Sequence, residues 1–283
     1  MRNNEERFGP PIMEDNSAAP AVQQPQESQV GGLNFVSPTE FVDLPSGGKL
    51  YPEGHPLHGK DTIEIKFMTA KEEDILTSKS LLKKGVAIDR MLQNLIVDKN
   101  IRLEQLLSGD KNAILLASRI SGYGPEYTVK MACPACEEKQ EFSFDLSIIE
   151  HKDMSDLDDL DLETTQRGTF VYTLPRTKAK VEFRLLTSGD ESQMTQEMVK
   201  LKKQENVSTD QLKRVVVSVN GVEDRLQLKQ FVENMPAADA RFLRAAIKRS
   251  TPDVEMSQTF TCASCSHEEE VEVPLTTEFF WPQ

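Results

Sequence analysis

The sequence Cys133-Pro-Ala-Cys136 and its counterpart Cys262-Ala-Ser-Cys265 contain all four cysteines of this 283-residue chain. Alternating apolar and polar residues flank both pairs, so each pair is predicted to lie at the tip of a β-hairpin. A tight turn that directs two thiolates at one point is half of a tetrahedral zinc site. The two turns therefore predict one zinc ion that ties together segments 129 residues apart. Its ligands are Cys133, Cys136, Cys262 and Cys265.

Other interpretations of these cysteines fit the pattern less well. A thioredoxin-like redox motif would lie at the start of a helix, after a buried strand. Disulfides remain an alternative, but Met1–Arg7 has no apolar run behind it like that of a secretion signal, so a reducing cytosol is expected. Four thiolates fill every position around zinc, which indicates a structural ion rather than a catalytic one. His267 follows the second pair and could replace one cysteine, although a solvated hairpin residue is the commoner role.

Composition limits the classes of partner. The formal net charge is −13 and the estimated pI is about 4.9. Such a chain is repelled by nucleic acid unless its cations cluster on one face. The sequence offers no concentrated basic face. Its best basic runs, Lys79–Lys84 and Lys200–Lys203, lie on helical patterns beside acidic residues. No apolar stretch is long enough to cross a bilayer. We expect a soluble intracellular protein with neither a nucleic-acid nor a membrane partner.

The two ends of the chain differ in character from its middle. Residues 1–35 contain few large apolar side chains and are predicted to form a disordered tail. Residues 36–62 form a Gly/Pro-rich loop segment, in which Gly47 and Gly48 suggest an anion-binding nest but lack the spacing of a nucleotide-binding loop. Residues 151–168 are predicted to be a solvated acidic linker.

An internal repeat organises the remainder. Ile63–Ala70 (IEIKFMTA) recurs as Val181–Ser188 (VEFRLLTS), with an offset of 118 residues. Each strand-like stretch ends at a threonine followed by acidic residues, which predicts a helix start at Thr69 with Glu72 and at Thr187 with Asp190.

The same order of segments continues after each strand. Helices are predicted at 70–83 and 190–206, apolar segments at 92–100 and 212–220, and capped helices from 108 and from 236, before the two cysteine hairpins. The predicted fold is α+β, with two pseudo-repeated strand-helix-helix-hairpin units, 63–150 and 169–283, joined by a four-cysteine site like that of a zinc ribbon. The offset grows to 129 residues, which indicates an insertion within 221–230.

The chain carries no pattern typical of an enzyme. It has no nucleophile elbow, no His-rich metal set and no dinucleotide fingerprint. His55 and His58 in the Gly/Pro-rich segment could serve as acid and base, but such residues more often fill turns. We expect no catalytic residues and no small-molecule substrate. Near the C-terminus, Phe279, Phe280 and Trp281 either fold back on the core or bind a partner, which makes them candidate partner-binding residues.

Two of these stretches resemble a known family. Leu44–Pro52 (LPSGGKLYP), followed by Ile63–Leu76 (IEIKFMTAKEEDIL), is similar to the baseplate hub and assembly proteins of T-even-like tailed bacteriophages, and so are the paired cysteine hairpins and the Phe-Phe-Trp-Pro ending. The resemblance covers residues 35–283. It implies a non-enzymatic protein of the tail baseplate, which is either a virion component or an assembly factor that leaves the finished baseplate. Such a protein would be located in the host cytoplasm during assembly, or in the virion. Other tail or baseplate proteins would be its partners.

A second hypothesis comes from a different class. Zinc ribbons also occur in transcription regulators that bind nucleic acid or RNA polymerase. That role requires a concentrated basic face, so charge distinguishes the two hypotheses.

Overall fold

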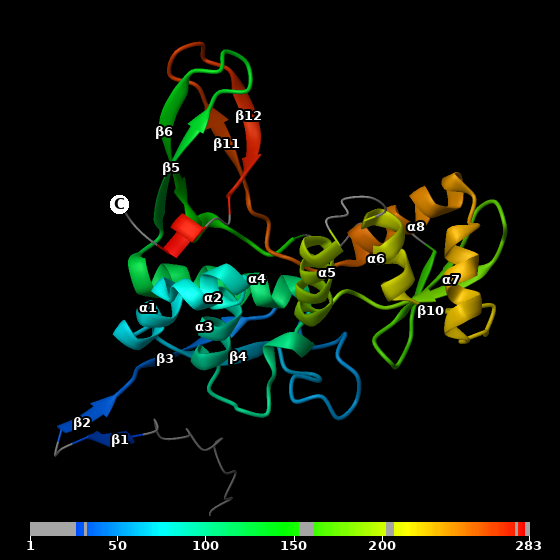
Figure 1. Ribbon diagram of the computed structural model, residues 1–283, viewed down its shortest axis with the longest axis horizontal. Coiled ribbons are helices and arrows are strands. Elements are labelled where there is room, and N and C mark those ends of the chain that lie inside the picture. The colour runs from blue at the N-terminus through cyan, green and yellow to red at the C-terminus, as the bar shows by residue number, and fades with distance from the viewer. Residues whose placement is uncertain (1–26, 31–32, 153–160, 202–206, 275–276, 281–283) are drawn as a thin grey trace, which may run out of the picture. The chain divides into compact units, whose positions relative to one another are not determined.

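The computed structural model describes residues 27–30, 33–152, 161–201, 207–274 and 277–280, which divide into two units (Figure 1). In the first unit, residues 1–38, strand β1 (Glu27–Val30) pairs antiparallel with β2 (Leu33–Val36). This hairpin lies inside the segment that the sequence predicts to be a disordered tail. Val30, Phe35 and Val36 lie in its two strands, and β-branched and aromatic residues favour strand pairing. Residues 1–26 of the predicted tail lie outside the described residues.

The second unit, residues 39–283, begins with a β-hairpin. Strand β3 (Thr39–Asp43) pairs antiparallel with β4 (Thr62–Lys66). The predicted loop segment 36–62 is therefore wrong at its start, because β3 is too short for its alternation to stand out beside the glycines and prolines. Ile65 of β4 also bridges to Ile96.

Helices α1 (Ala70–Thr77), α2 (Lys79–Lys84) and α3 (Ala87–Leu95) follow β4. The predicted helix 70–83 is interrupted at Ser78, whose backbone is extended. After the short 3-10 helix η1 (Leu103–Gln105), helix α4 (Ser108–Tyr123) begins at the predicted position.

The later part of the chain forms an antiparallel sheet in the order β10-β9-β8-β7. Its strands are β7 (Leu162–Thr164), β8 (Phe170–Thr173), β9 (Lys180–Phe183) and β10 (Val216–Val219). Four helices accompany it: α5 (Ser188–Leu201), α6 (Val207–Val215), α7 (Arg225–Glu233) and α8 (Ala237–Ser250). The predicted acidic linker therefore contains β7, while its residues 153–160 lie outside the described residues. Helix α7 occupies most of the predicted insertion.

The starts of α1 and α5 have the predicted capping contacts, whereas no side chain caps the starts of α4 and α8, which the sequence also predicts to be capped. The Glu72 carboxylate accepts hydrogen bonds from the backbone N–H and the hydroxyl of Thr69. At α5, the Asp190 carboxylate accepts the same two hydrogen bonds from Thr187, and the Asp190 N–H donates to the Thr187 hydroxyl. These side chains satisfy N–H groups that have no partner within the helix.

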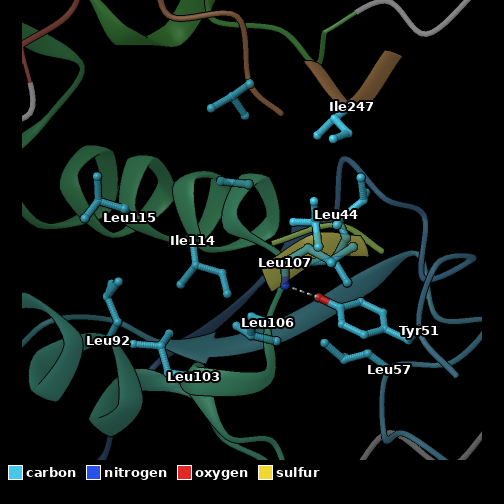
Figure 2. Close-up of a cluster of buried hydrophobic side chains, with 14 of the residues drawn as sticks. Leu44, Tyr51, Leu57, Leu92, Leu103, Leu106, Leu107, Ile114, Leu115 and Ile247 are labelled. Carbon is cyan, nitrogen blue, oxygen red and sulfur yellow. Dashed lines mark hydrogen bonds between the residues drawn. The ribbon is translucent and has the colours of Figure 1, made fainter. Parts of the chain in front are cut away.

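One hydrophobic core spans the second unit (Figure 2). Leu44 and Leu57 from the β3–β4 loop, Ile114 of α4 and Ile247 of α8 all belong to this cluster of buried side chains. The Leu107 N–H donates to the Tyr51 hydroxyl at 3.1 Å, which holds the loop against the start of α4 (Figure 2).

The early and late parts of the second unit also meet through backbone contacts. The Ser108 N–H donates to the Leu186 carbonyl at 3.3 Å, and the Ser188 N–H donates to the Leu106 carbonyl at 2.8 Å. The starts of α4 and α5 are thus joined directly. Any metal at the cysteines therefore reinforces a junction that the core already makes.

Candidate metal centre

Two β-hairpins project together from the helices and carry the cysteines at their tips (Figure 1). Strand β5 (Glu126–Ala132) pairs with β6 (Lys139–Asp145), and β11 (Ser257–Thr261) pairs with β12 (Glu268–Glu272). The predicted hairpins are present at both cysteine pairs. We call these two hairpins and the turns between their strands the cysteine head.

The two turns have the same backbone geometry. In the first, the Cys133 N–H donates to the Glu138 carbonyl and the Glu137 N–H donates to the Cys133 carbonyl, both at 2.9 Å. In the second, Cys262 makes the equivalent two bonds with His267 and Ser266, also at 2.9 Å. Glu137 and Ser266 both have positive φ, 60° and 57°. Each turn therefore closes tightly enough to direct both of its sulfurs the same way.

The four sulfurs converge on one point. All four Sγ atoms lie within 4.8 Å of one another, with Cys133 to Cys265 at 3.8 Å and Cys136 to Cys262 at 3.7 Å. A tetrahedral ion with metal–sulfur bonds of about 2.3 Å places its ligands about 3.8 Å apart. The arrangement fits a four-coordinate metal ion.

The same distances separate this site from a disulfide framework. A disulfide needs sulfurs about 2.05 Å apart, and all four cysteines are free. His267 is outside the four-sulfur group, and its Nε2 lies 3.3 Å from a Glu269 carboxylate oxygen. The four cysteines alone supply the candidate ligands.

The four thiols lie close enough to change one another's pKa. Backbone N–H groups of Cys265 and Ser264 lower the pKa of the Cys262 thiol to about 6. The N–H of Glu138 lowers the pKa of Cys136, but hydrogen bonds with the other three thiols raise it to about 12. One thiolate therefore forms readily, and a bound cation would favour the remaining three.

Two glutamines join the hairpins across β6 and β11. Gln258 accepts from the Asp145 N–H at 3.1 Å and donates to the Asp145 carbonyl at 2.6 Å. Gln140 accepts from the Ala263 N–H at 3.0 Å and donates to the Thr261 carbonyl at 3.4 Å. These amides take the place of a backbone ladder between the two sheets.

The base of the cysteine head is tied to α4 and to the C-terminal residues. Arg119 is 1% exposed and donates to the carbonyls of Phe279 (2.6 Å), Gly124 (2.5 Å) and Glu126 (2.9 Å). The rings of Tyr127 and Phe279 meet edge to face at 5.0 Å. Arg119 therefore fixes where the first hairpin leaves the helices. Its fully buried guanidinium gives no signal in the sequence.

The aromatic C-terminus lies on the chain itself. Phe279 and Phe280 are each 1% exposed and belong to the main core. Of the two alternatives, their burial fits folding back, and it leaves these two rings little surface for a partner. Trp281, the third candidate, lies outside the described residues.

The Gly/Pro-rich loop is organised from within. Gly47 and Gly48 have positive φ as a nest requires, but the Gly48 N–H donates to the Ser46 hydroxyl. Ser46 and Tyr51 in turn donate to Asp110, which is fully buried at the start of α4. The sequence pattern predicts a helix start near Asp110, but nothing in it indicates that Asp110 holds this loop.

The fold and the cysteine site together define a mixed helix and sheet protein with a candidate four-cysteine metal centre. The family model described as T4 bacteriophage base plate protein matches residues 37–281. The chain therefore belongs to this family of phage baseplate proteins, as its sequence suggests. Comparisons with curated proteins and with solved structures gave no match. None of the helices in the described ranges has the length and hydrophobicity of a membrane span.

Proposed function

We propose that this protein is a non-enzymatic component or assembly factor of a contractile-tail baseplate, braced by one structural zinc ion. The convergence of four free thiols from two hairpins that are remote in sequence carries the proposal. Family membership supplies the biological setting. Zinc held by four thiolates has no open position for water, so the ion would brace the protein and would not catalyse a reaction.

Zinc is the metal that the donors fit best. Thiolates are soft ligands, and a tetrahedral set of four suits zinc or an iron centre. In zinc proteins the protein contributes backbone N–H groups and hydrogen bonds that orient the ligands. Here the Ala135 N–H donates to Cys133 Sγ at 3.4 Å, and the two glutamine bridges keep the hairpins in register.

We further propose that the second unit consists of two copies of one ancestral element. Ile65 bridges to Ile96 in the first copy, and Phe183 pairs with Val216 in the second. These pairs are related by the offsets of 118 and 120 residues that relate the sequences.

A buried carboxylate supports the same relationship. Asp110 accepts from the Ser46 N–H at 3.0 Å, and Asp239 accepts from the Arg176 N–H at 2.8 Å. In each case an aspartate near a helix start holds the turn between two paired strands. Each copy supplies one cysteine hairpin, so neither has a complete metal site.

Metal analysis tests the chemical part of the proposal. Protein purified without added metal should contain one zinc per chain by elemental mass spectrometry, and Cys136→Ser should lose it. One iron per chain, or zinc retained in full by that variant, would contradict the assignment. The His267→Ala variant serves as the matched control and should keep its zinc.

Fractionation of infected cells tests the biological part. Mass spectrometry of purified virions should detect the protein in tails if it is a component. If it is an assembly factor, the protein should be found with baseplate intermediates and be missing from virions. Its absence from both fractions, with normal tails in a deletion phage, would count against a baseplate role.

A further inference from the structure

The outer face of α8 is basic, although the chain as a whole is strongly acidic. Residues 225–250, which span α7 and α8, contain six Lys and Arg against two Asp and Glu, a net charge of +4 in a chain whose total is −13. The expectation that the chain has no concentrated basic face is wrong here. Helix periodicity gathers cations that are scattered in the sequence.

The positions on α8 show how the face forms. Successive residues turn by about 100° around the axis, so Arg241, Arg244 and Lys248 share one stripe. All three side chains are exposed, whereas Leu243 and Ile247 on the opposite side are buried.

No acidic side chain of α7 or α8 pairs with the cations of this stripe among the described residues. Helix α7 adds the exposed cations Arg225 and Lys229. The two acidic residues of α7 and α8 are already engaged, since Glu233 pairs with Lys213 at 2.8 Å and buried Asp239 accepts backbone N–H bonds. Among the described residues, the five exposed cations form no ion pair. They are Arg225, Lys229, Arg241, Arg244 and Lys248.

Exposed apolar side chains also lie on α7 and α8, although the helix turn of about 100° per residue places Phe242 on a different side of α8 from the stripe of cations. Phe242 on α8 is 49% exposed and Leu226 on α7 is 66% exposed. Arginine and aromatic residues are enriched at protein interfaces, where the ring contributes buried area and the guanidinium contributes directed hydrogen bonds. The exposed residues of these two helices are therefore of the types found at contact surfaces.

Part of the stripe also borders a hollow of about 1080 Å³. Arg244 and Lys248 line it, and Glu191, Glu255 and Glu272 lie elsewhere on its wall. No ion pair joins these charges among the described residues. The cations of α8 therefore keep their charge available to a partner.

The cysteine head is the most acidic part of the described fold. Residues 126–145 and 256–273 contain nine Asp and Glu against two Lys. All nine carboxylates are on exposed residues, and Glu137, Glu138, Glu268 and Glu269 flank the cysteine turns at the tip. A zinc ion with four thiolates would add a net charge of −2 there.

We propose that the acidic tip of the cysteine head of one chain docks on the basic face of α8 of a second copy. The two surfaces have opposite charge and lie on different parts of the fold, so each copy would both give and receive a contact. Such a head-to-tail arrangement is heterologous and forms rings or open chains rather than only symmetric dimers. The proposal goes beyond the baseplate role and concerns a surface other than the metal ligands.

Charge-reversal variants test this contact. The helix variant carries Arg241→Glu, Arg244→Glu and Lys248→Glu, and the tip variant carries Glu137→Lys, Glu138→Lys and Glu268→Lys. The control variant reverses three exposed lysines of α2, with Lys79→Glu, Lys83→Glu and Lys84→Glu. Zinc content and circular dichroism of each establish that it is folded, and they report on the metal assignment separately.

Sedimentation at a series of protein concentrations gives the readout. The natural chain should assemble at an ionic strength of about 0.03 M and dissociate at about 0.5 M, where charges are screened within a few ångströms. The helix and tip variants should each associate at least tenfold more weakly, and the control variant should behave like the natural chain. Mixing the helix and tip variants should restore association, because the acidic tip of the helix variant meets the basic face of the tip variant and the reversed tip meets the reversed face.

Three results would overturn the proposal. They are a natural chain that stays monomeric at every concentration, a helix variant that still assembles by itself, and a mixture of the two variants that does not associate. Fluorescence anisotropy with labelled duplex DNA tests the alternative that the basic face binds nucleic acid. Salt-sensitive DNA binding that the helix variant loses would assign the face to nucleic acid and would revive the regulator hypothesis.

Discussion

The hydroxyl of Tyr51 donates a 2.6 Å hydrogen bond to the buried carboxylate of Asp110, 59 residues away. The same hydroxyl accepts from the Leu107 N–H, and Ser46 donates to the same carboxylate. Burial raises the pKa of Asp110, and these hydrogen bonds act in the opposite direction. One carboxylate thus fixes the Gly/Pro-rich loop on the core.

Asp110→Ala should destabilise the protein by about 2–4 kcal/mol, because it leaves several buried donors without an acceptor. Tyr51→Phe should cost less, about 1–2 kcal/mol. Urea denaturation measures both. The exposed Asp74→Ala substitution on α1 is the control and should change stability by less than about 0.5 kcal/mol. Equal stability of Asp110→Ala and the natural chain would contradict the assigned role.

The Asp190–Arg184 pair should make stability depend on acid pH. Burial raises the pKa of Asp190, but the hydrogen bonds from Arg184 and Thr187 outweigh it and lower the pKa to about 2. A carboxylate with a lowered pKa stabilises the folded state above its ordinary value of 3.8, and this contribution disappears as the pH falls to about 2. Because Arg184 is partly exposed, we expect only about 1–2 kcal/mol.

Asp190→Asn tests this expectation. Its stability deficit relative to the natural chain should be complete at neutral pH and should shrink as the pH falls from 4 to 2. Arg184→Gln should show the same dependence, since it removes the other partner. A deficit that stays constant over this range in low-salt urea titrations would show that the pair is not responsible.

Metal removal should loosen the cysteine head before the core. The cluster around Cys133, Phe260 and Cys262 is small, whereas the main core is extensive. Structural zinc contributes on the order of 10 kcal/mol of apparent binding energy in small domains, but here the helices retain their own packing. Cys136→Ser or a chelator should therefore raise amide exchange in β5, β6, β11 and β12 and lower the melting temperature, while α4 stays protected. Unchanged exchange in the head after verified metal loss would contradict the bracing role, and His267→Ala is the control.

Arg119→Met should release the C-terminal residues from the core. The substitution removes the donors to three backbone carbonyls, which should cost about 3 kcal/mol or more. Arg119→Lys keeps the charge but lacks the planar fork that reaches all three acceptors. Carboxypeptidase digestion should accelerate in both variants, and Arg90→Met, at an exposed position on α3, should behave like the natural chain. Digestion at the natural rate in Arg119→Met would show that other contacts hold the terminus.

Local patterns made several features predictable. The cysteine hairpins follow from period-2 alternation around each Cys-x-x-Cys pair, and the starts of α1 and α5 follow from a threonine with an acidic residue three positions later. Strand β3 and helix α7 were not predictable in this way. Each is short, and its sequence also suits a loop. Ser78 divides a helix that the residue pattern presents as continuous.

The sequence determined by itself that the chain has two thiol-bearing hairpins, strands that lead into capped helices, and the family to which it belongs, because each depends on residues that are close together along the chain. Only the tertiary structure decided that four sulfurs lie within 4.8 Å, that Arg119 is buried beneath Phe279, and that the cations of α8 share one exposed face. Those relationships join residues that are far apart in the chain or depend on which side of a helix meets the core. Tertiary packing sets these relationships, and no local sequence pattern encodes that packing.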